Sequence, residues 1–159
     1  MSRLLLSVRI PGEPVGKGRP RVAVRNGRAH AYTPAGTASW EARAEWHMGS
    51  SWGAHRGPEE GPVSVRVLAL KSRPKGLLPK DQGGTAPKSR PPVVTRTVRT
   101  TKPDGDNVIK AAADALVNAG ILRDDVQVVR WEAWSLYPAL GEEAGVVVEV
   151  SAWDGEVPA

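Results

Sequence analysis

The chain has 159 residues, the size of one domain, and its 40% hydrophobic and 25% charged residues exclude a disordered or a membrane-embedded protein. Cysteine is absent, which excludes a disulfide framework and any thiolate metal site. Apolar runs such as Leu4–Leu6 are too short for a membrane span or a signal-peptide core, so we expect a cytoplasmic protein with no membrane partner.

The net charge of +5 is unevenly distributed along the chain. Residues 1–102 carry 19 Lys and Arg against 6 Asp and Glu, whereas residues 103–159 carry 3 against 11, so the two parts have net charges of +13 and −8. Basic side chains that neutralise phosphates release condensed counterions, so a surface of this charge suits a polyanion. We therefore expect the first part to contact nucleic acid and the second part to do a different job.

The N-terminal third predicts a strand, a hairpin and a helix. Apolar residues alternate over 4–11 and predict a strand that ends at Pro11. Asn26-Gly27, the preferred pair for a type I′ turn, lies between 21–25 and 28–32 and predicts a basic hairpin arm. Thr33 as N-cap with proline at the first helical position predicts a helix near 35–50.

The remaining elements follow from the same patterns. A strand is predicted near 62–71, and residues 72–92, rich in Pro, Gly, Lys and Arg without any period, predict a long, mobile, basic loop. A short strand over 94–98, a helix over 107–118 and strands over 126–136 and 144–152 come next. Together they predict one α+β domain over residues 1–153, with a mixed or antiparallel sheet, two main helices and a frayed tail over 154–159.

The tryptophans fall into two groups by pattern. We expect Trp40, Trp131 and Trp134 to pack in the core, whereas Trp46 and Trp52 are candidates for stacking on bases.

Three acidic residues carry the candidate chemistry. Asp104 and Asp106 immediately precede the predicted helix, where Asp106 can cap free backbone amides. Lys110 follows four residues after Asp106, which places its ammonium on the same helical face. The next connection supplies the pair Asp124-Asp125, one of which can add a third carboxylate. Convergent carboxylates need a cation, and Mg²⁺ prefers such oxygen ligands in phosphodiester hydrolysis.

The acidic motif also has other interpretations. Asp-Gly-Asp-Asn is a common turn and cap sequence, so the spacing alone does not establish catalysis. An EF-hand calcium loop is excluded because Ile109 stands at the position of its glycine and Ala115 at the position of its bidentate glutamate. Asp114, in the middle of the predicted helix, fits a solvated face better than a supporting role in the site.

The same residues resemble the signature of RusA-type Holliday-junction resolvases, in the form often found in phages and prophages. The likeness spans roughly residues 10–130 and rests on five runs: 16–21 (GKGRPR), 32–34 (YTP), 102–110 (KPDGDNVIK), 114–116 (DAL) and 124–128 (DDVQV). It implies that Asp104, Asp106 and Asp125 bind the metal and, with Lys110, form the catalytic set. It also implies a homodimer that uses Mg²⁺ or Mn²⁺ and cuts branched DNA in symmetry-related pairs.

Further residues complete the expected site. Asn107 and Asp124 are candidates to orient the metal ligands from outside. The expected DNA-binding residues are Lys17, Arg19, Arg21, Arg25, Arg28 and Lys102. The chain departs from the family pattern at Gly105, where a larger aliphatic residue is usual, and in the length and basicity of the segment 71–102.

Sequence reasoning thus favours a structure-selective endonuclease that resolves four-way junctions in DNA recombination and repair. Two alternatives come from other classes: a non-catalytic DNA-binding protein whose Asp cluster is structural, and a metal-dependent hydrolase of small phosphate esters. The strongly basic first part of the chain argues against the latter.

Overall fold

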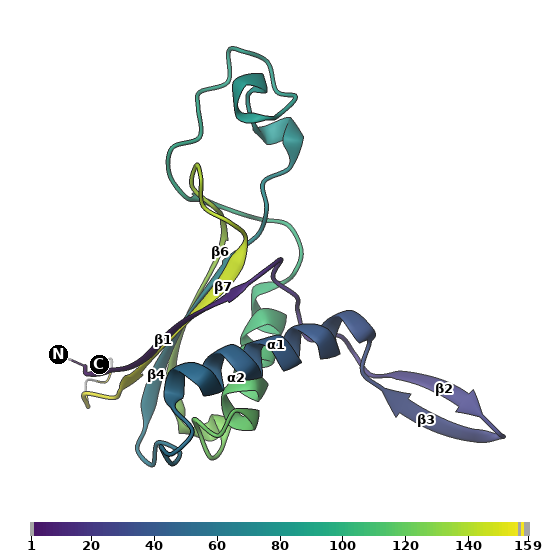
Figure 1. Cartoon of the computed structure of the whole chain (residues 1–159), viewed down its shortest axis with the longest axis vertical. Helices are drawn as coiled ribbons and strands as arrows, with labels where there is room; N and C mark the ends of the chain where they lie inside the picture. The colour runs from purple at the N-terminus through teal and green to yellow at the C-terminus, as the bar shows by residue number, and fades with distance from the viewer. Residues whose placement is uncertain (1, 156, 158–159) are drawn as a thin grey trace.

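The computed structural model describes residues 2–155 and residue 157. The strands are β1 (Leu4–Pro11), β2 (Arg21–Arg25), β3 (Arg28–Tyr32), β4 (Val63–Leu70), β5 (Thr97–Val98), β6 (Val128–Tyr137) and β7 (Gly145–Ala152). The helices are α1 (Ala35–Trp52) and α2 (Gly105–Asn118), with short 3₁₀ turns η1 (Lys75–Leu77), η2 (Lys80–Gln82) and η3 (Asp125–Gln127) (Figure 1). The expected α+β class with two main helices is confirmed. The expected frayed tail includes residues 156, 158 and 159, which lie outside the described residues.

Five strands form a mixed sheet in the order β1-β7-β4-β6-β5. Strands β4 and β6 are parallel, and every other neighbouring pair is antiparallel. The parallel pair needs a long crossover, and the segment from β4 to β6 supplies it with α2. The sheet therefore places the start of α2 beside the ends of β4 and β6, and the start of β6 beside the start of β4.

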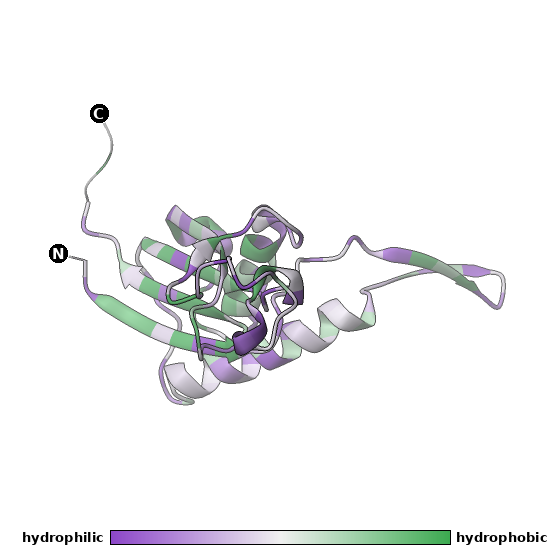
Figure 2. Ribbon diagram, turned by 90° about the horizontal axis from the view of Figure 1, so that it is seen from above, coloured by the Kyte–Doolittle hydropathy of each residue, from purple (hydrophilic) through white to green (hydrophobic). Residues whose placement is uncertain are grey.

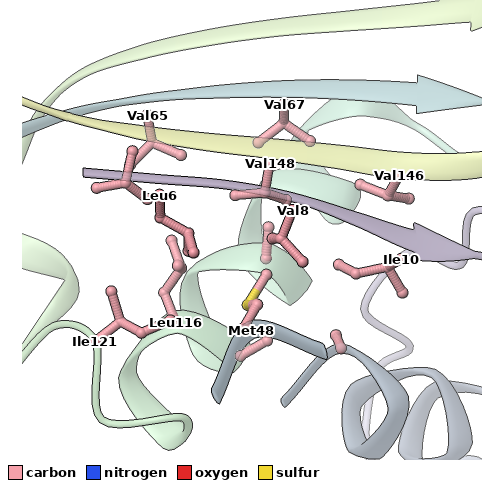
Figure 3. Packing of buried hydrophobic residues seen from close by; sticks show 14 of the residues in the cluster. Leu6, Val8, Ile10, Met48, Val65, Val67, Leu116, Ile121, Val146 and Val148 are labelled. Atoms are coloured by element: carbon pink, nitrogen blue, oxygen red, sulfur yellow. The ribbon is translucent and has the colours of Figure 1, made fainter. Parts of the chain in front are cut away.

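Both helices cover one face of this sheet (Figure 1). Alternate residues of β1, β4 and β7 point to that face, where Val8, Val67 and Val148 meet Met48 of α1 and Leu116 of α2 (Figure 3). The buried residues of α1 recur at three- and four-residue spacing, which is one helical face. The opposite face of the sheet stays polar, with Arg66 bridging Glu132 and Glu149 across neighbouring strands at 3.2 and 3.3 Å.

The β2–β3 hairpin projects away from the body as an arm (Figures 1 and 2). Asn26 and Gly27 have φ of 52° and 72°, as a type I′ turn requires, so the predicted turn is confirmed. All ten strand residues are exposed. Residues that pair across the two strands lie on the same face. Val22 and Val24 therefore lie on one side of the arm, and the arginines at 21, 25 and 28 lie on the other.

The cap position of the first helix lies one residue later in the chain than expected. Pro34, not Thr33, stands at the cap position of α1 and makes no side-chain cap hydrogen bond, so the predicted capping by Thr33 is wrong. The helix runs to Trp52 and ends at Gly53, whose φ of 96° a side chain would strain. None of the helices in the described part of the chain is long and apolar enough to cross a membrane.

Two tryptophan predictions are wrong for simple geometric reasons. Trp131 and Trp134 are three positions apart on β6, so they point to opposite faces of the sheet, and Trp134 is 48% exposed while Trp131 packs partly against the core. Trp52 lies one helical turn beyond Met48 and is buried, with its indole N–H donating to the Gly57 carbonyl at 3.1 Å. Trp40 is buried as predicted, and Trp46, 67% exposed, remains available for stacking.

The long segment between β4 and β5 forms a protruding lobe, defined here as residues 72–96 (Figure 1). It has more local structure than the absence of a period predicts: the backbone N–H groups of Thr85 and Ala86 donate to Lys75 and Leu78, and Gln82 bonds both backbone groups of Val93. The predicted strand over 94–98 is confirmed only at its end, as β5.

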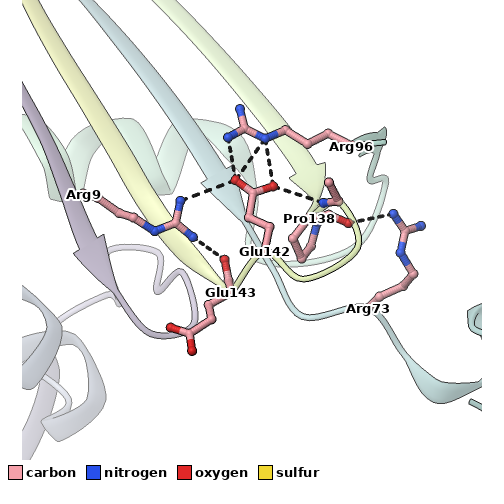
Figure 4. A network of polar contacts seen from close by, with 7 residues as sticks. Arg9, Arg73, Arg96, Pro138, Glu142 and Glu143 are labelled. Carbon is pink, nitrogen blue, oxygen red and sulfur yellow. Dashed lines mark hydrogen bonds and ion pairs between the residues drawn. The ribbon is translucent and has the colours of Figure 1, made fainter. Parts of the chain in front are cut away.

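Arginine side chains fasten this lobe to the sheet around Glu142 (Figure 4). Arg96 Nε donates to Glu142 at 2.9 Å, Arg9 approaches the same carboxylate at 3.5 Å, and Arg73 donates to the Pro138 carbonyl at 3.0 Å. The hydrogen bond from Arg96 is the main reason that the pKa of Glu142 falls from 4.5 to about 2, with help from the Ala139 N–H. Burial opposes this shift only in part.

Glu142 should therefore make the free energy of unfolding depend on pH in the acid range. Its folded-state pKa is depressed, so its contribution is complete above pH 4.5 and is lost as the pH falls toward 2. At 1.36 kcal/mol per pKa unit the contribution is at most about 3 kcal/mol. Urea unfolding at several pH values should show that the wild type loses more stability than Glu142→Gln in this window. Parallel pH curves for the two proteins would contradict the assignment.

Candidate active site

Asp104 and Asp106 lie at the start of α2 with exposed carboxylates. Asp104 is the cap residue, with φ −69° and ψ 141°, and its carbonyl accepts the first helical hydrogen bond from Val108 at 3.2 Å. Its side chain makes no cap hydrogen bond. Asp106 lies inside the first turn, so the prediction that Asp106 caps the helix is wrong. Both carboxylates instead project beside the positive end of the helix dipole, which favours anionic groups there.

Lys110 lies on the same helical face as Asp106, as its spacing predicts. Their side chains are 3.4 Å apart, and both are more than 60% exposed. Such a surface pair contributes little to stability. The ammonium therefore stays accessible to a ligand that approaches the start of α2.

The adjacent acids Asp124 and Asp125 have different surroundings. Asp124 accepts a hydrogen bond from the Val126 N–H at 3.0 Å and forms a capping box with Gln127 at η3. Asp125 is exposed and, among the described residues, its carboxylate takes part in no hydrogen bond or ion pair. The expected strand does not begin here but at Val128, so a turn rather than strand alternation separates the roles of the two acids.

The turn η3 contacts α2, so all three acids lie beside this helix. Asp104 and Asp106 lie at its start, near Ser135 toward the end of β6, whereas Asp125 lies at the other end, where η3 leads into the start of β6. Within residues 2–155, however, no group of three or more acidic or imidazole side chains is close enough to hold a metal ion. Asp104 and Asp106 thus form an exposed pair, and Asp125 is not assembled with them. The donor chemistry of the pair fits Mg²⁺, which commonly takes one or two carboxylates and completes its shell with water and phosphate.

An open pocket of about 370 Å³ adjoins Asp104. Lys17, Lys71 and Lys102 come from three separate segments and line it together with Asn107. The N-terminal segment reaches the pocket because the Lys17 N–H donates to the Asn107 carbonyl at 3.0 Å. Gly16 permits this approach, since a Cβ there would lie 2.9 Å from the Asn107 Cβ.

Sequence reasoning missed two features of this pocket. Lys71 follows β4 and reaches the site only through the fold, so no local pattern distinguishes it from the other basic residues around it. Asp114 lies on a partly exposed face of α2, as expected, but its carboxylate also pairs with the Lys17 ammonium, a contact that the sequence does not predict. Gly105, by contrast, is not required by crowding: a Cβ there would lie 3.7 Å from Ser135 Oγ, an ordinary contact.

The expected DNA-binding residues divide between two places. Lys17 and Lys102 lie at the pocket beside Asp104. Arg21, Arg25 and Arg28 lie on the exposed arm, and Arg19 precedes it. A polyanion that spans the arm and the pocket would therefore meet positive charge at both.

Comparison with known proteins agrees with this arrangement. Residues 11–151 match the family described as "Endodeoxyribonuclease RusA". The chain is also 34% identical over 145 residues to an uncharacterised protein, YqaN, of Bacillus subtilis (strain 168), in a match that covers 89% of this chain and 94% of YqaN. The family match spans the arm, the pocket, the start of α2 and η3, and the chain therefore belongs to the RusA family of endodeoxyribonucleases.

Proposed function

We propose that this protein resolves four-way DNA junctions by metal-dependent hydrolysis of phosphodiester bonds, in recombination and repair. The observation that carries the proposal is the exposed pair of carboxylates at the start of α2 beside a lysine-lined pocket, in a chain of an endodeoxyribonuclease family. We propose that residues 1–153 act as one nuclease unit.

Each residue of the site is assigned a role. Asp104 and Asp106 would hold Mg²⁺ or Mn²⁺, which when bound would supply a Lewis acid for the scissile phosphate. The family likeness assigns Asp125 as a third ligand, which would have to be brought to the other two, because the described part of a single chain does not assemble the three acids. Lys110 reaches toward the same phosphate, and Lys17 and Lys102 bind neighbouring phosphates along the pocket. Asp124 caps η3 and so fixes the backbone that carries Asp125. The Asn107 carbonyl accepts a hydrogen bond from the Lys17 N–H and so holds the N-terminal segment at the pocket.

The decisive experiment incubates the protein with a labelled four-way junction in Mg²⁺ and, separately, in chelator. Paired incision that depends on the metal supports the proposal. Binding without metal-dependent incision would instead support the non-catalytic DNA-binding alternative. Hydrolysis of small phosphate esters without junction cleavage would support the third function.

A junction has two equivalent strands to cut, whereas one chain carries one acidic site. Paired incision therefore requires a two-fold dimer, and we propose a homodimer. Light scattering should give the mass of two chains at the concentrations that cleave junctions. A stable monomer that nicks the two strands independently would contradict this assignment.

The arm should contribute affinity rather than chemistry. Replacing Arg21, Arg25 and Arg28 by Ala should weaken junction binding at every salt concentration and flatten its salt dependence by about one unit of slope per lost phosphate contact. The three side chains are exposed, so the fold should be unaffected. Gel-shift titrations across a salt series measure the slope. Val22→Ala on the opposite side of the arm is the matched control and should leave it unchanged.

A further inference from the structure

The three residues that precede Asp104 have their carbonyl oxygens held by the cationic side chains of Arg99 and Lys71. Arg99 donates to the carbonyls of Thr101 and Pro103, through both terminal nitrogens at 3.4 Å in the second case. Lys71 Nζ donates to the Lys102 carbonyl at 2.7 Å. At 2.7 Å the charge-assisted bond from Lys71 is stronger than a neutral one, whereas the two bonds to Pro103 are long and weaker. Together they form a clamp on the segment 101–103.

Arg99 is an unusual residue to find in this position. Only 4% of it is exposed, although the guanidinium is charged at any ordinary pH and its burial is costly unless it is well paired. Among the described residues no carboxylate forms an ion pair with Arg99, and its Nε is buried without a partner. Desolvation by burial accordingly lowers the pKa of Arg99. A residue that only served solubility would not be placed here.

The remaining contacts anchor the clamp to the sheet. The Arg99 backbone N–H donates to the Ser135 carbonyl of β6 at 2.9 Å, and the Thr101 hydroxyl lies 3.4 Å from the Tyr137 hydroxyl. The segment 101–103 is therefore tied to β6 on one side and to the end of β4, through Lys71, on the other. Its last residue leads directly into Asp104.

We infer that Arg99, assisted by Lys71, is a positioning residue that holds the segment 101–103 so that Asp104 and Asp106 present their carboxylates to the metal. The inference rests on the proposed function, because it assigns these two acids to metal binding. Arg99 is not assigned to DNA contact, because its guanidinium is bonded to backbone carbonyls. Lys71 can both hold the Lys102 carbonyl and contact phosphate, since it also lines the pocket.

Arg99→Lys tests the clamp while keeping the charge. Lysine lacks the planar fork, so it cannot span two carbonyls as the guanidinium does. The weakening expected for losing a group that orients metal ligands is about 10-fold to 100-fold in metal affinity. Mn²⁺ binding to the free protein, followed by electron paramagnetic resonance of unbound Mn²⁺, measures this directly without cleavage. Lys71→Met removes one carbonyl contact and should weaken Mn²⁺ binding by a smaller factor.

Arg73→Gln is the matched control. Arg73 is also an arginine that donates to a backbone carbonyl, that of Pro138, but it lies in the lobe rather than beside the acids. It should bind Mn²⁺ like the wild type. Junction binding in chelator should be the same for Arg99→Lys as for the wild type, since the Arg99 side chain is buried against backbone carbonyls and faces no phosphate.

The outcomes separate the inference from the proposed function. Wild-type affinity for Mn²⁺ in both Arg99→Lys and Lys71→Met would overturn the inference, as would equal weakening in Arg73→Gln. If Arg99→Lys fails a thermal melt, Lys71→Met decides the question alone, because Lys71 lies at the surface of the pocket and its loss leaves the core intact. A wild-type protein that binds no Mn²⁺ and cuts no junction would instead overturn the proposed function itself.

Discussion

Asp125→Asn should lower the rate of junction cleavage in Mg²⁺ by orders of magnitude, whereas Asp124→Asn should leave most of it. Asparagine keeps the size of the side chain but removes the charge that a hard cation requires. Asp125 is exposed and its carboxylate forms no hydrogen bond or ion pair within the described chain, so the change has no structural cost. Single-turnover cleavage of a labelled four-way junction measures the effect for both variants.

The neighbouring acid is the natural control because its role is structural. In Asp124→Asn the new amide still offers an oxygen to the Val126 N–H, so the cap of η3 survives. Junction binding without metal should persist in Asp125→Asn or become tighter, because a negative charge near the phosphates is gone. Full activity in Asp125→Asn, or its loss only in Asp124→Asn, would show that the third ligand is assigned wrongly.

Leu116→Ala should be the most destabilising of the changes considered. Leu116 is fully buried where α2 meets the sheet and α1, and truncating a buried leucine costs about 2–5 kcal/mol through lost burial and the cavity left behind. Domains of this size are stable by only about 5–15 kcal/mol, so the loss is a large fraction of the total. Urea unfolding at neutral pH measures it.

Val126→Ala provides the comparison for this truncation. Val126 is 80% exposed on η3, and surface changes of this kind usually stay within about 0.5 kcal/mol. A loss for Leu116→Ala no larger than that for Val126→Ala would mean that the packing of α2 against the sheet is not what holds the acidic pair in place.

Features set by short-range rules could be predicted from the sequence. The hairpin turn depends only on Asn26-Gly27, which adopts the required positive φ values, and the face shared by Asp106 and Lys110 depends only on helical periodicity. The strands whose residues alternate, such as β1 and β4, are equally clear. In each case the residues that determine the structure are neighbours in the chain.

Features set by long-range contacts could not be predicted in this way. Whether Trp134 is buried depends on which face of β6 the helices cover, and alternation alone does not tell one face from the other. The clamp at Arg99 and the arrival of Lys71 at the pocket depend on the parallel pairing of β4 with β6. The order inside the lobe likewise comes from contacts such as Gln82 with Val93, which leave no periodic trace.

The strand order has a consequence for the uneven charge of the chain. Strands β1, β4 and β5 precede Pro103 and strands β7 and β6 follow it, so in the order β1-β7-β4-β6-β5 every sheet neighbour comes from the other side of that residue. The basic and acidic parts are therefore interleaved rather than separated in space, and pairs such as Arg66 with Glu149 and Lys17 with Asp114 join them. Two peptides cut at this point would each lack any partner for their own strands of this sheet. With net charges of +13 and −8 the two peptides should instead associate with each other and reassemble the sheet as a split protein. Because salt screens this attraction, the association should be fastest at low ionic strength.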